Sequence, residues 1–218
     1  MNAPNTFWPG GTVYGTLLNF KREFDFFKPQ MVQPPYKAPP HQPVLYVKTA
    51  NTFNRNGGAV PVPAHLSPVE IGATLGMVMG EAGHVAGWVL LNDMSIPHAS
   101  YFRPPVKFKC LDGFLGVGSQ VLPAGKLGDP ALVQLQVCVN GVLQQTIDFG
   151  QLVRPAATLL HDVMAFMTLQ SGDVLLLGLD CLPSGKRPCA NVGDQVDIAS
   201  PTHPALGALS HTLNQEAA

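Results

Sequence analysis

The chain is rich in the two residues that interrupt regular structure, with 22 glycines and 21 prolines among 218 residues. Average usage is about 7% glycine and about 5% proline. Proline lacks the backbone donor that helices and sheets need, and glycine weakens helices through its backbone freedom. Long helices are therefore excluded as the main architecture. We expect short elements joined by many turns, in a chain whose length suits one domain of about 100–200 residues.

Runs of β-branched and apolar residues predict the strands. They lie at 12–18, 44–48, 74–79, 85–91, 133–139, 142–147, 174–177 and 192–198. Asn140-Gly141 separates two of these runs and predicts a hairpin, because both residues tolerate the positive φ angles of a type I′ turn. One helix is predicted from Pro155 to about Leu169, where apolar residues recur at helical spacing before Ser171-Gly172.

These elements predict a mostly β fold with a few helices, in a single domain spanning residues 1–218. Residues 1–10 and 205–218 are expected to be loose ends. The most apolar window, 72–91, is nearly long enough to cross a bilayer. It contains Glu81 and His84, so we interpret it as two buried strands instead.

Charged residues are scarce: 13 Lys and Arg with 14 Asp and Glu make 12% of the chain, and the net charge is −1. About 25% is usual. A chain without excess positive charge has no field that attracts nucleic acid or an anionic membrane, so neither is expected as a partner. A surface this poor in charge indicates that another subunit covers part of it, and we expect an oligomer.

The four cysteines form no Cys-x-x-Cys pair, and no signal peptide precedes them. Reduced thiols in a cytoplasmic protein are therefore the expectation. The histidines lack a second His or Cys at ligand spacing, which disfavours a zinc site.

Lys107 and Lys109 are the first candidates for chemistry. If the chain after Pro105 is extended, both side chains lie on one face of a strand and suit a small anionic ligand. The alternative is a pair of solvated lysines that protect an edge strand from aggregation.

Asp93 is the second candidate, because Asn92-Asp93-Met94-Ser95 follows a very apolar strand. Its carboxylate could coordinate a hard cation, act as an acid or base, or cap the next turn. Glu23, among Lys21, Arg22 and Asp25, could be a general base, and a solvated helix face is the alternative.

Several segments together resemble the fumarylacetoacetate hydrolase family over about residues 11–198. The most diagnostic are Tyr36-Lys37-Ala38-Pro39-Pro40, Gly72-Ala73-Thr74, Asn92-Asp93-Met94-Ser95 and the stretch from Phe102-Arg103-Pro104 through Lys109-Cys110 to Asp112-Gly113-Phe114. The resemblance implies a mixed β-sandwich roll, a dimer-type assembly and small β-keto or enol acid substrates.

The chain departs from the family pattern at the positions that the family uses for a metal. Active members carry two glutamates that bind Mg²⁺ or a similar ion together with an aspartate. Aligning on Val78-Met79-Gly80 places Gly72 and Thr74 at the glutamate positions, with Glu70 two residues earlier and Asp93 in place. One carboxylate makes a poor Mg²⁺ site. Mg²⁺ or a similar divalent cation is therefore a cofactor implied by the family alone, with Asp93 and Glu70 as its candidate ligands.

Other family positions differ too. The histidine that serves as the usual base is replaced by Glu23, and the Thr-Gly-Thr-Pro turn that holds substrate reads Leu177-Gly178-Leu179-Asp180. The family lysine matches Lys109, and Lys48 matches the lysine after the second strand. This pattern is similar to the N-terminal half of the isomerase/decarboxylases that degrade 4-hydroxyphenylacetate (homoprotocatechuate).

The resemblance implies roles for a small set of polar residues. Lys109 would stabilise an enolate or a carboxylate, and Glu23 or Asp93 would carry a proton. Five further residues would bind substrate: Lys48, Arg103, Lys107, Asn19 and Asp112.

The implied activity has two steps, conversion of 5-oxopent-3-ene-1,2,5-tricarboxylate to 2-hydroxyhepta-2,4-diene-1,7-dioate and its isomerisation to 2-oxohept-3-ene-1,7-dioate. One alternative is a non-catalytic subunit paired with a metal-binding homologue, and another is an acylpyruvate-type hydrolase. The expected partners are the anionic substrate and either a second copy of the chain or a C-terminal-type homologous subunit.

Overall fold

The computed structural model describes residues 6–63, 65–98 and 106–216. Strands dominate, as the sequence predicts. They are β1 (Val13–Leu17), β2 (Val44–Lys48), β3 (Phe53–Arg55), β4 (Ala59–Val62), β5 (Val69–Glu70), β6 (Ala73–Met79), β7 (Val85–Asp93), β8 (Leu115–Val117), β9 (Leu122–Pro123), β10 (Gln134–Val139), β11 (Val142–Asp148), β12 (Val174–Leu176), β13 (Cys189–Ala190), β14 (Gln195–Ala199) and β15 (Ala208–Gln215).

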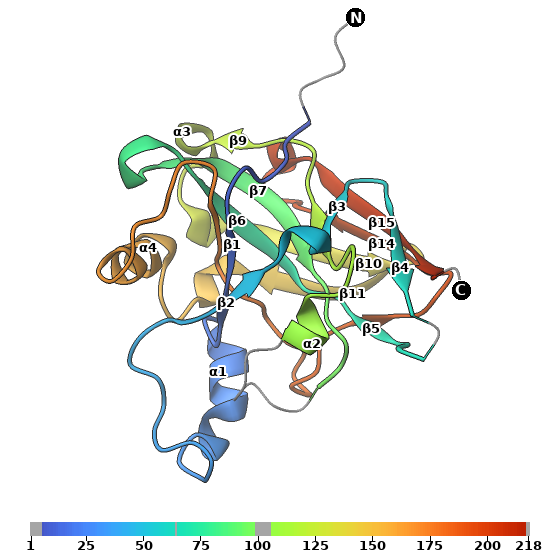
Figure 1. Ribbon diagram of the computed structural model, residues 1–218, viewed down its shortest axis with the longest axis horizontal. Helices are drawn as coiled ribbons and strands as arrows, with labels where there is room; N and C mark the ends of the chain where they lie inside the picture. The colour runs from blue at the N-terminus through green and yellow to red at the C-terminus, as the bar shows by residue number, and fades with distance from the viewer. Residues whose placement is uncertain (1–5, 64, 99–105, 217–218) are drawn as a thin grey trace, which may run out of the picture.

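The strands form two large sheets and one small one. The first sheet has the order β2-β1-β12-β6-β7-β8-β3, with β9 paired to β7, and the second has the order β11-β10-β14-β15-β4. β5 and β13 form a separate two-stranded ladder. In Figure 1 the large sheets fill the centre of the molecule, and α4 lies at one side.

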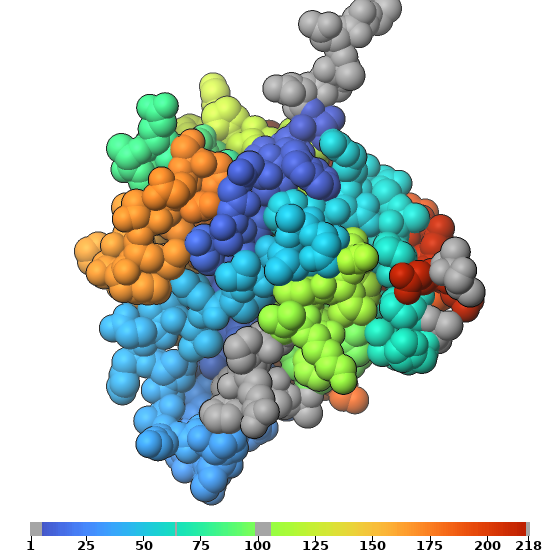
Figure 2. Space-filling view, in the orientation of Figure 1, coloured from blue at the N-terminus to red at the C-terminus, as the bar shows by residue number. Residues whose placement is uncertain are grey.

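The helices are short, as the glycine and proline content requires. They are α1 (Lys21–Phe27), α2 (Val106–Lys109), α3 (Ala124–Leu127) and α4 (Ala156–Met164). α1 extends from the body at the bottom of Figure 1, and the residues that follow it along the chain contribute to the lower lobe of the surface in Figure 2. In the part of the chain that the structure describes, no helix is long and apolar enough to cross a membrane.

The central strands of the first sheet, β6, β8 and β12, are buried on both faces, which explains their continuous apolar runs. Every residue of β6 is buried. Leu75, Met77 and Met79 pack into the main core that the two sheets share. Val78 points to the opposite face, where it joins a smaller apolar cluster. Charged groups inside such an interior must be paired, so each buried one is informative.

The hairpin is confirmed. β10 and β11 pair antiparallel, and both Asn140 and Gly141 have positive φ angles. The helix after Pro155 is confirmed in place but was predicted too long, because it ends at Met164. Phe166 is 61% exposed, so the apolar face that the spacing predicts does not continue into a last turn.

Two further predictions were wrong. Residues 107–109 belong to α2 and not to a strand, so Lys107 is exposed while Lys109 is buried. The segment 205–218 is not a loose end up to residue 216, because β15 pairs with both β14 and β4. Leu209, His211 and Leu213 point inward along β15, and the histidine in the middle hides the alternation from a hydropathy reading.

Candidate active site

Asp93 lies at the buried end of β7, between two ammonium groups. Nζ of Lys48, from the end of β2, is 2.9 Å from Oδ1, and Nζ of Lys109, from the end of α2, is 3.1 Å from Oδ2. The hydroxyl of Tyr46 donates a hydrogen bond to Oδ2. All four side chains are buried. The arrangement is a carboxylate held by two cations and one neutral donor.

The backbone around this group leaves room for an aromatic ring. β1 pairs with β2 so that Gly15 lies opposite Tyr46. A side chain at position 15 would overlap the Tyr46 ring, so glycine is required there. The ring also lies 5.1 Å from the Lys109 ammonium, within the range of a cation–π contact.

The protonation of these groups follows from burial and pairing. Burial opposes the charged form of Asp93, but Lys109, Lys48 and the Tyr46 hydroxyl outweigh it and hold the pKa of Asp93 at about 2. Burial lowers the pKa of Lys109 from 10.5 to about 8, although Asp93 attracts the ammonium charge. Burial and Asp93 raise the pKa of Tyr46 well above its usual value. At neutral pH the site therefore holds a carboxylate, a protonated Lys109 and a neutral phenol.

A second buried ion group lies beside the first. Arg187 donates from Nη2 to Oε1 of Glu23 and, at 3.4 Å, from Nη1 to Oε2 of Glu70. One alternative from the sequence placed Glu23 on a solvent-exposed face of a helix. The structure shows instead that its side chain turns inward from α1 and accepts a hydrogen bond from the backbone N–H of Leu18 at 2.8 Å. Only 3% of Glu23 is exposed. Burial raises the pKa of Glu23, while Arg187 opposes that rise.

Local pairing explains why Glu70 and Arg187 meet. Glu70 pairs with Cys189 across the β5–β13 ladder. Arg187 lies two residues before Cys189 in the chain, so its side chain is close to Glu70. The charges of Glu23 and Glu70 raise the pKa of Arg187 against the effect of burial. The positive charge of Arg187 also lowers the pKa of Lys109, so the two ion groups are near enough to be described together as one cluster.

A pocket of about 640 Å³ opens beside this cluster, and we call it the Glu70 pocket. It is lined by Phe26, Phe27, Gln30, Pro68, Glu70, Pro97, His98, Ser184, Gly185, Lys186 and Cys189. Glu70 is the one carboxylate among these described lining residues, and it links the pocket to Arg187. Lys186 adds an exposed cation at the rim. Aromatic and apolar walls with one cation and one carboxylate suit a small organic acid.

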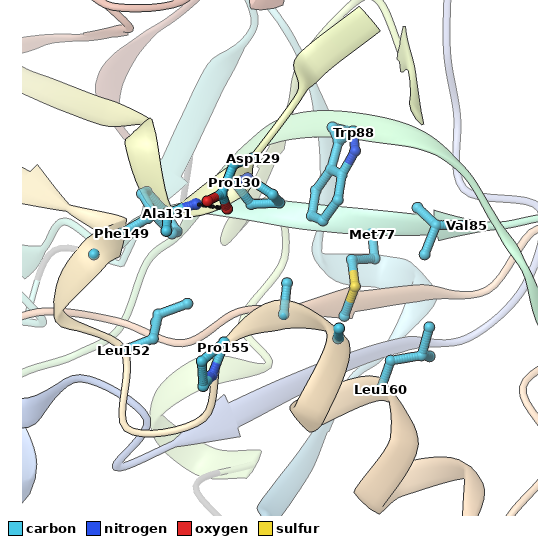
Figure 3. Close-up of a pocket in the computed structure, with 13 residues that line it drawn as sticks. Met77, Val85, Trp88, Asp129, Pro130, Ala131, Phe149, Leu152, Pro155 and Leu160 are labelled. Carbon is cyan, nitrogen blue, oxygen red and sulfur yellow. Dashed lines mark hydrogen bonds between the residues drawn. The ribbon is translucent and has the colours of Figure 1, made fainter. Parts of the chain in front are cut away.

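A smaller cavity, of about 340 Å³, lies between α4 and the ends of β6 and β7 (Figure 3). Met77, Trp88 and Leu160 contribute to its apolar wall. Its carboxylate, Asp129, accepts a hydrogen bond from the backbone N–H of Ala131 and thereby caps a turn. This cavity lacks the paired charges that acid–base chemistry needs, so the Glu70 pocket is the better candidate.

The structure brings together some of the residues chosen from the sequence and separates others. Lys48, Lys109, Asp93, Glu23 and Glu70 all belong to the buried cluster. Lys107 is exposed on α2. Arg103 lies outside the described residues.

Two expected substrate ligands have other partners. Asn19 is buried. Its side-chain NH₂ donates to the carbonyl oxygens of Arg154 and Leu177, and its side-chain oxygen accepts from the backbone N–H of Arg154. Asp112 is exposed and accepts from Asn51 at 2.6 Å. Asn19 therefore fixes the chain before α1, and Asp112 fixes the loop after α2.

Arg187 was missed. It lies in a Pro-Ser-Gly-Lys-Arg-Pro loop, residues 183–188, from which no candidate was chosen. In a chain with 13 Lys and Arg, two adjacent basic residues in a loop were a usable signal. The pairing with Glu23 and Glu70 could not be foreseen, because it depends on how distant segments of the chain pack.

The described side chains near Asp93 and Glu70 do not form the set of oxygen or nitrogen donors that a divalent cation needs. Within the described ranges, no group of three or more His, Cys, Asp or Glu side chains is arranged to hold a metal ion. Asp93 is paired with lysines and Glu70 with Arg187. The residues present do not fit the divalent cation that the family resemblance implies.

Comparison with known families decides the classification. Residues 12–214 match the fumarylacetoacetate (FAA) hydrolase C-terminal family. The chain belongs to the fumarylacetoacetate hydrolase family. It is 34% identical over 206 residues to the 4-hydroxyphenylacetate degradation bifunctional isomerase/decarboxylase of Salmonella dublin, covering 90% of this chain and 46% of that protein. The homoprotocatechuate catabolism bifunctional isomerase/decarboxylase of Escherichia coli is 31% identical with the same coverage. The chain thus spans about half the length of these curated relatives.

Solved structures confirm the family fold. Fumarylpyruvate hydrolase from Pseudomonas aeruginosa, in complex with Mn²⁺ and pyruvate, superimposes with a TM-score of 0.78 at 19% identity, covering 99% of this chain and 94% of that one. The 2-hydroxyhepta-2,4-diene-1,7-dioate isomerase from Mycobacterium marinum gives a TM-score of 0.75 at 21% identity, covering 98% and 78%. At these identities the likeness shows the fold.

Proposed function

We propose that this fumarylacetoacetate hydrolase family member isomerises small 2-oxo and enol dicarboxylic acids in the Glu70 pocket. The specific step is conversion of 2-hydroxyhepta-2,4-diene-1,7-dioate to 2-oxohept-3-ene-1,7-dioate. The observation that carries the proposal is Glu70 itself, which lines the pocket and is ion-paired to Arg187, beside the buried group that contains Lys109. The relatives at 31–34% identity, which are isomerase/decarboxylases, support the choice of substrate class.

The reaction moves one proton. The enol oxygen at carbon 2 loses a proton to a base, and the electrons delocalise over the diene as a dienolate. Carbon 5 then gains a proton, which leaves a carbonyl at carbon 2 and a double bond between carbons 3 and 4. Atoms and charge balance without any other reactant, so the protein must supply a proton carrier and a cation near the oxygen.

The cluster offers one group for each task. We assign stabilisation of the dienolate to the Lys109 ammonium, which Asp93 holds in place at 3.1 Å. We assign the proton transfer to Glu70, because it is the carboxylate in the pocket wall. Glu23 is ion-paired to Arg187 and positions it beside Glu70. Asp93, with a pKa of about 2, remains ionised at neutral pH and positions Lys109.

A cation at the pocket rim can bind a carboxylate of the substrate. Lys186 is exposed and lines the pocket, so it is placed to attract an anion. The ammonium of Lys48 is enclosed by protein oxygens, so the substrate-binding role expected for it from sequence does not enter the proposal.

The decarboxylation that precedes this isomerisation also forms a dienolate, which the Lys109 ammonium could stabilise in the same way. In 5-oxopent-3-ene-1,2,5-tricarboxylate, the departing carboxylate is attached to carbon 2, a saturated carbon next to the double bond between carbons 3 and 4. That double bond is conjugated to the carbonyl at carbon 5. Loss of carbon dioxide sends the bonding electrons into a dienolate, which a cation near the oxygen stabilises. We propose that the two steps are shared with a C-terminal-type homologous unit, because the relatives are about twice as long as this chain.

The test follows the ultraviolet absorbance of the dienol with the purified chain alone and with a C-terminal-type homologous partner. Turnover by the chain alone is the expected result. Activity that appears only in the mixture, and that partner mutations abolish, would instead make the chain a structural subunit. Hydrolysis of acylpyruvates by the chain would favour the hydrolase alternative.

A further inference from the structure

The ammonium of Lys48 lies in a cage of oxygen atoms. It is 2.9 Å from Oδ1 of Asp93 and 2.9 Å from the carbonyl oxygen of Phe114. It also donates to the carbonyl of Lys109 and lies 3.5 Å from that of Met94. The Lys48 side chain has no exposed surface. One carboxylate and three carbonyls are the oxygen donors that proteins use for hard cations, and here they surround a cation that belongs to the chain.

The two positions that family resemblance gives to metal-binding glutamates cannot supply ligands. A Cβ at Gly72 would overlap the backbone carbonyl oxygen of Asp93, so no longer side chain fits without a shift of the backbone. Thr74 is fully buried, and its hydroxyl donates to the carbonyl of Gly178 at 2.6 Å. Neither position carries the negative charge that a metal-binding glutamate would supply.

The charges of the cluster already balance. Its three carboxylates, Asp93, Glu23 and Glu70, face three cations, Lys48, Lys109 and Arg187. All six side chains are buried or nearly so. A divalent cation would add two positive charges that no buried group compensates, at a large cost in an apolar interior.

We propose that the Lys48 ammonium is the resident cation of this site and that the chain binds no divalent metal at Asp93. The inference concerns the same cluster as the proposed function but depends on binding and stability alone. Failure of the isomerase assay would therefore leave it intact, and metal binding at Asp93 would overturn it whatever the reaction.

The first test uses the methionines of the unmodified protein as probes. The chain has 7 methionines, and their ¹³C-labelled methyl groups can be followed by NMR during titration with Mn²⁺. Met94 adjoins Asp93, whereas Met164 lies at the exposed end of α4. We expect Met94 to stay as sharp as Met164. Saturable broadening of Met94 ahead of Met164 would show Mn²⁺ at Asp93 and overturn the proposal.

The second test empties the cage. In Lys48→Ala the missing atoms correspond to n-propylammonium, so this ion should raise the lowered unfolding temperature of the variant by binding the folded state. Neutral 1-propanol at the same concentration should raise it less. The control is Lys48→Met, in which the side chain fills the space without a charge, and n-propylammonium should have no effect on it. Equal effects of the ion and the alcohol on Lys48→Ala would contradict a cage that requires a cation.

A variant that does not fold leaves the first test in force, because it needs no substitution.

Discussion

Glu23 and Glu70 come from different elements and share the guanidinium of one residue, Arg187. This link joins Glu70, in the pocket wall, to the buried Glu23, and the paired group lies beside the buried lysine–aspartate group. The residues of the two groups come from α1, β2, β5, β7, α2 and the loop before β13. Arg187 is the shared partner of both carboxylates, so its removal leaves two buried charges unpaired.

Arg187→Gln should destabilise the protein strongly. The side chain of Arg187 is 13% exposed, and its loss leaves two buried carboxylates without a cation. Breaking a buried ion pair on one side typically costs about 3–5 kcal/mol. Urea denaturation measures the free energy of unfolding. The matched control is Lys186→Gln, the adjacent exposed cation, which should change stability by less than about 0.5 kcal/mol.

Lys186→Gln should instead weaken substrate binding. Lys186 lines the pocket and the described structure gives it no ion-pair partner, so it acts on the bound dicarboxylate alone. We expect KM to rise with little change in kcat, which is the signature of binding that is equal in ground and transition states. Steady-state kinetics on the dienol decide this, and a fall in kcat with KM unchanged would place Lys186 in the chemical step.

Gly72→Ala should destabilise the fold although it adds only one methyl group. That methyl would meet the carbonyl oxygen of Asp93, which is backbone and cannot rotate away. Overpacking of this kind costs about 1–3 kcal/mol. Gly10→Ala is the control, since its Cβ would meet nothing. Thermal unfolding compares the two, and equal midpoints would show that the backbone at Asp93 shifts easily.

Stability should fall on acidification because of His211. Burial lowers the pKa of this imidazole from 6.5 to about 4. Between these values the unfolded chain binds a proton that the folded chain does not, so the stabilisation is present above pH 6.5 and is lost as the pH falls toward 4. The difference amounts to roughly 3 kcal/mol.

Urea denaturation at several pH values measures that slope. His211→Leu continues the inward apolar row of Leu209 and Leu213, and it should flatten the profile in this range. An unchanged slope in the variant would assign the acid sensitivity to other groups.

Much of the fold follows from local sequence, and the exceptions have physical reasons. Alternation and turn chemistry located the hairpin at Asn140-Gly141. They failed at β15, where a neutral buried His211 occupies an inward position that looks polar. They also failed at Lys109, because a single helical turn and a strand cannot be distinguished over four residues.

The site was predictable only in part. Lys109 and Asp93 were chosen from their local sequence and again from the family resemblance, and the structure places Nζ of Lys109 3.1 Å from Oδ2 of Asp93. The inward turn of Glu23 and its partner Arg187 depend on packing between segments far apart in sequence. Lys48 was expected to bind substrate. Its burial among protein oxygen atoms could not be predicted, because the residues next to it in the sequence do not indicate it.

The most direct test of the account is the kcat/KM of Lys109→Met for isomerisation of the dienol, with Lys126→Met, an exposed lysine on α3, as control. Loss of one preorganised group that stabilises an oxyanion typically costs about 10²–10³ in rate. The account predicts a fall of at least about a hundredfold for Lys109→Met, with circular dichroism showing a folded protein and with Lys126→Met unchanged. A fall of less than about tenfold in a folded Lys109→Met protein would contradict the assignment of this cluster as the active site.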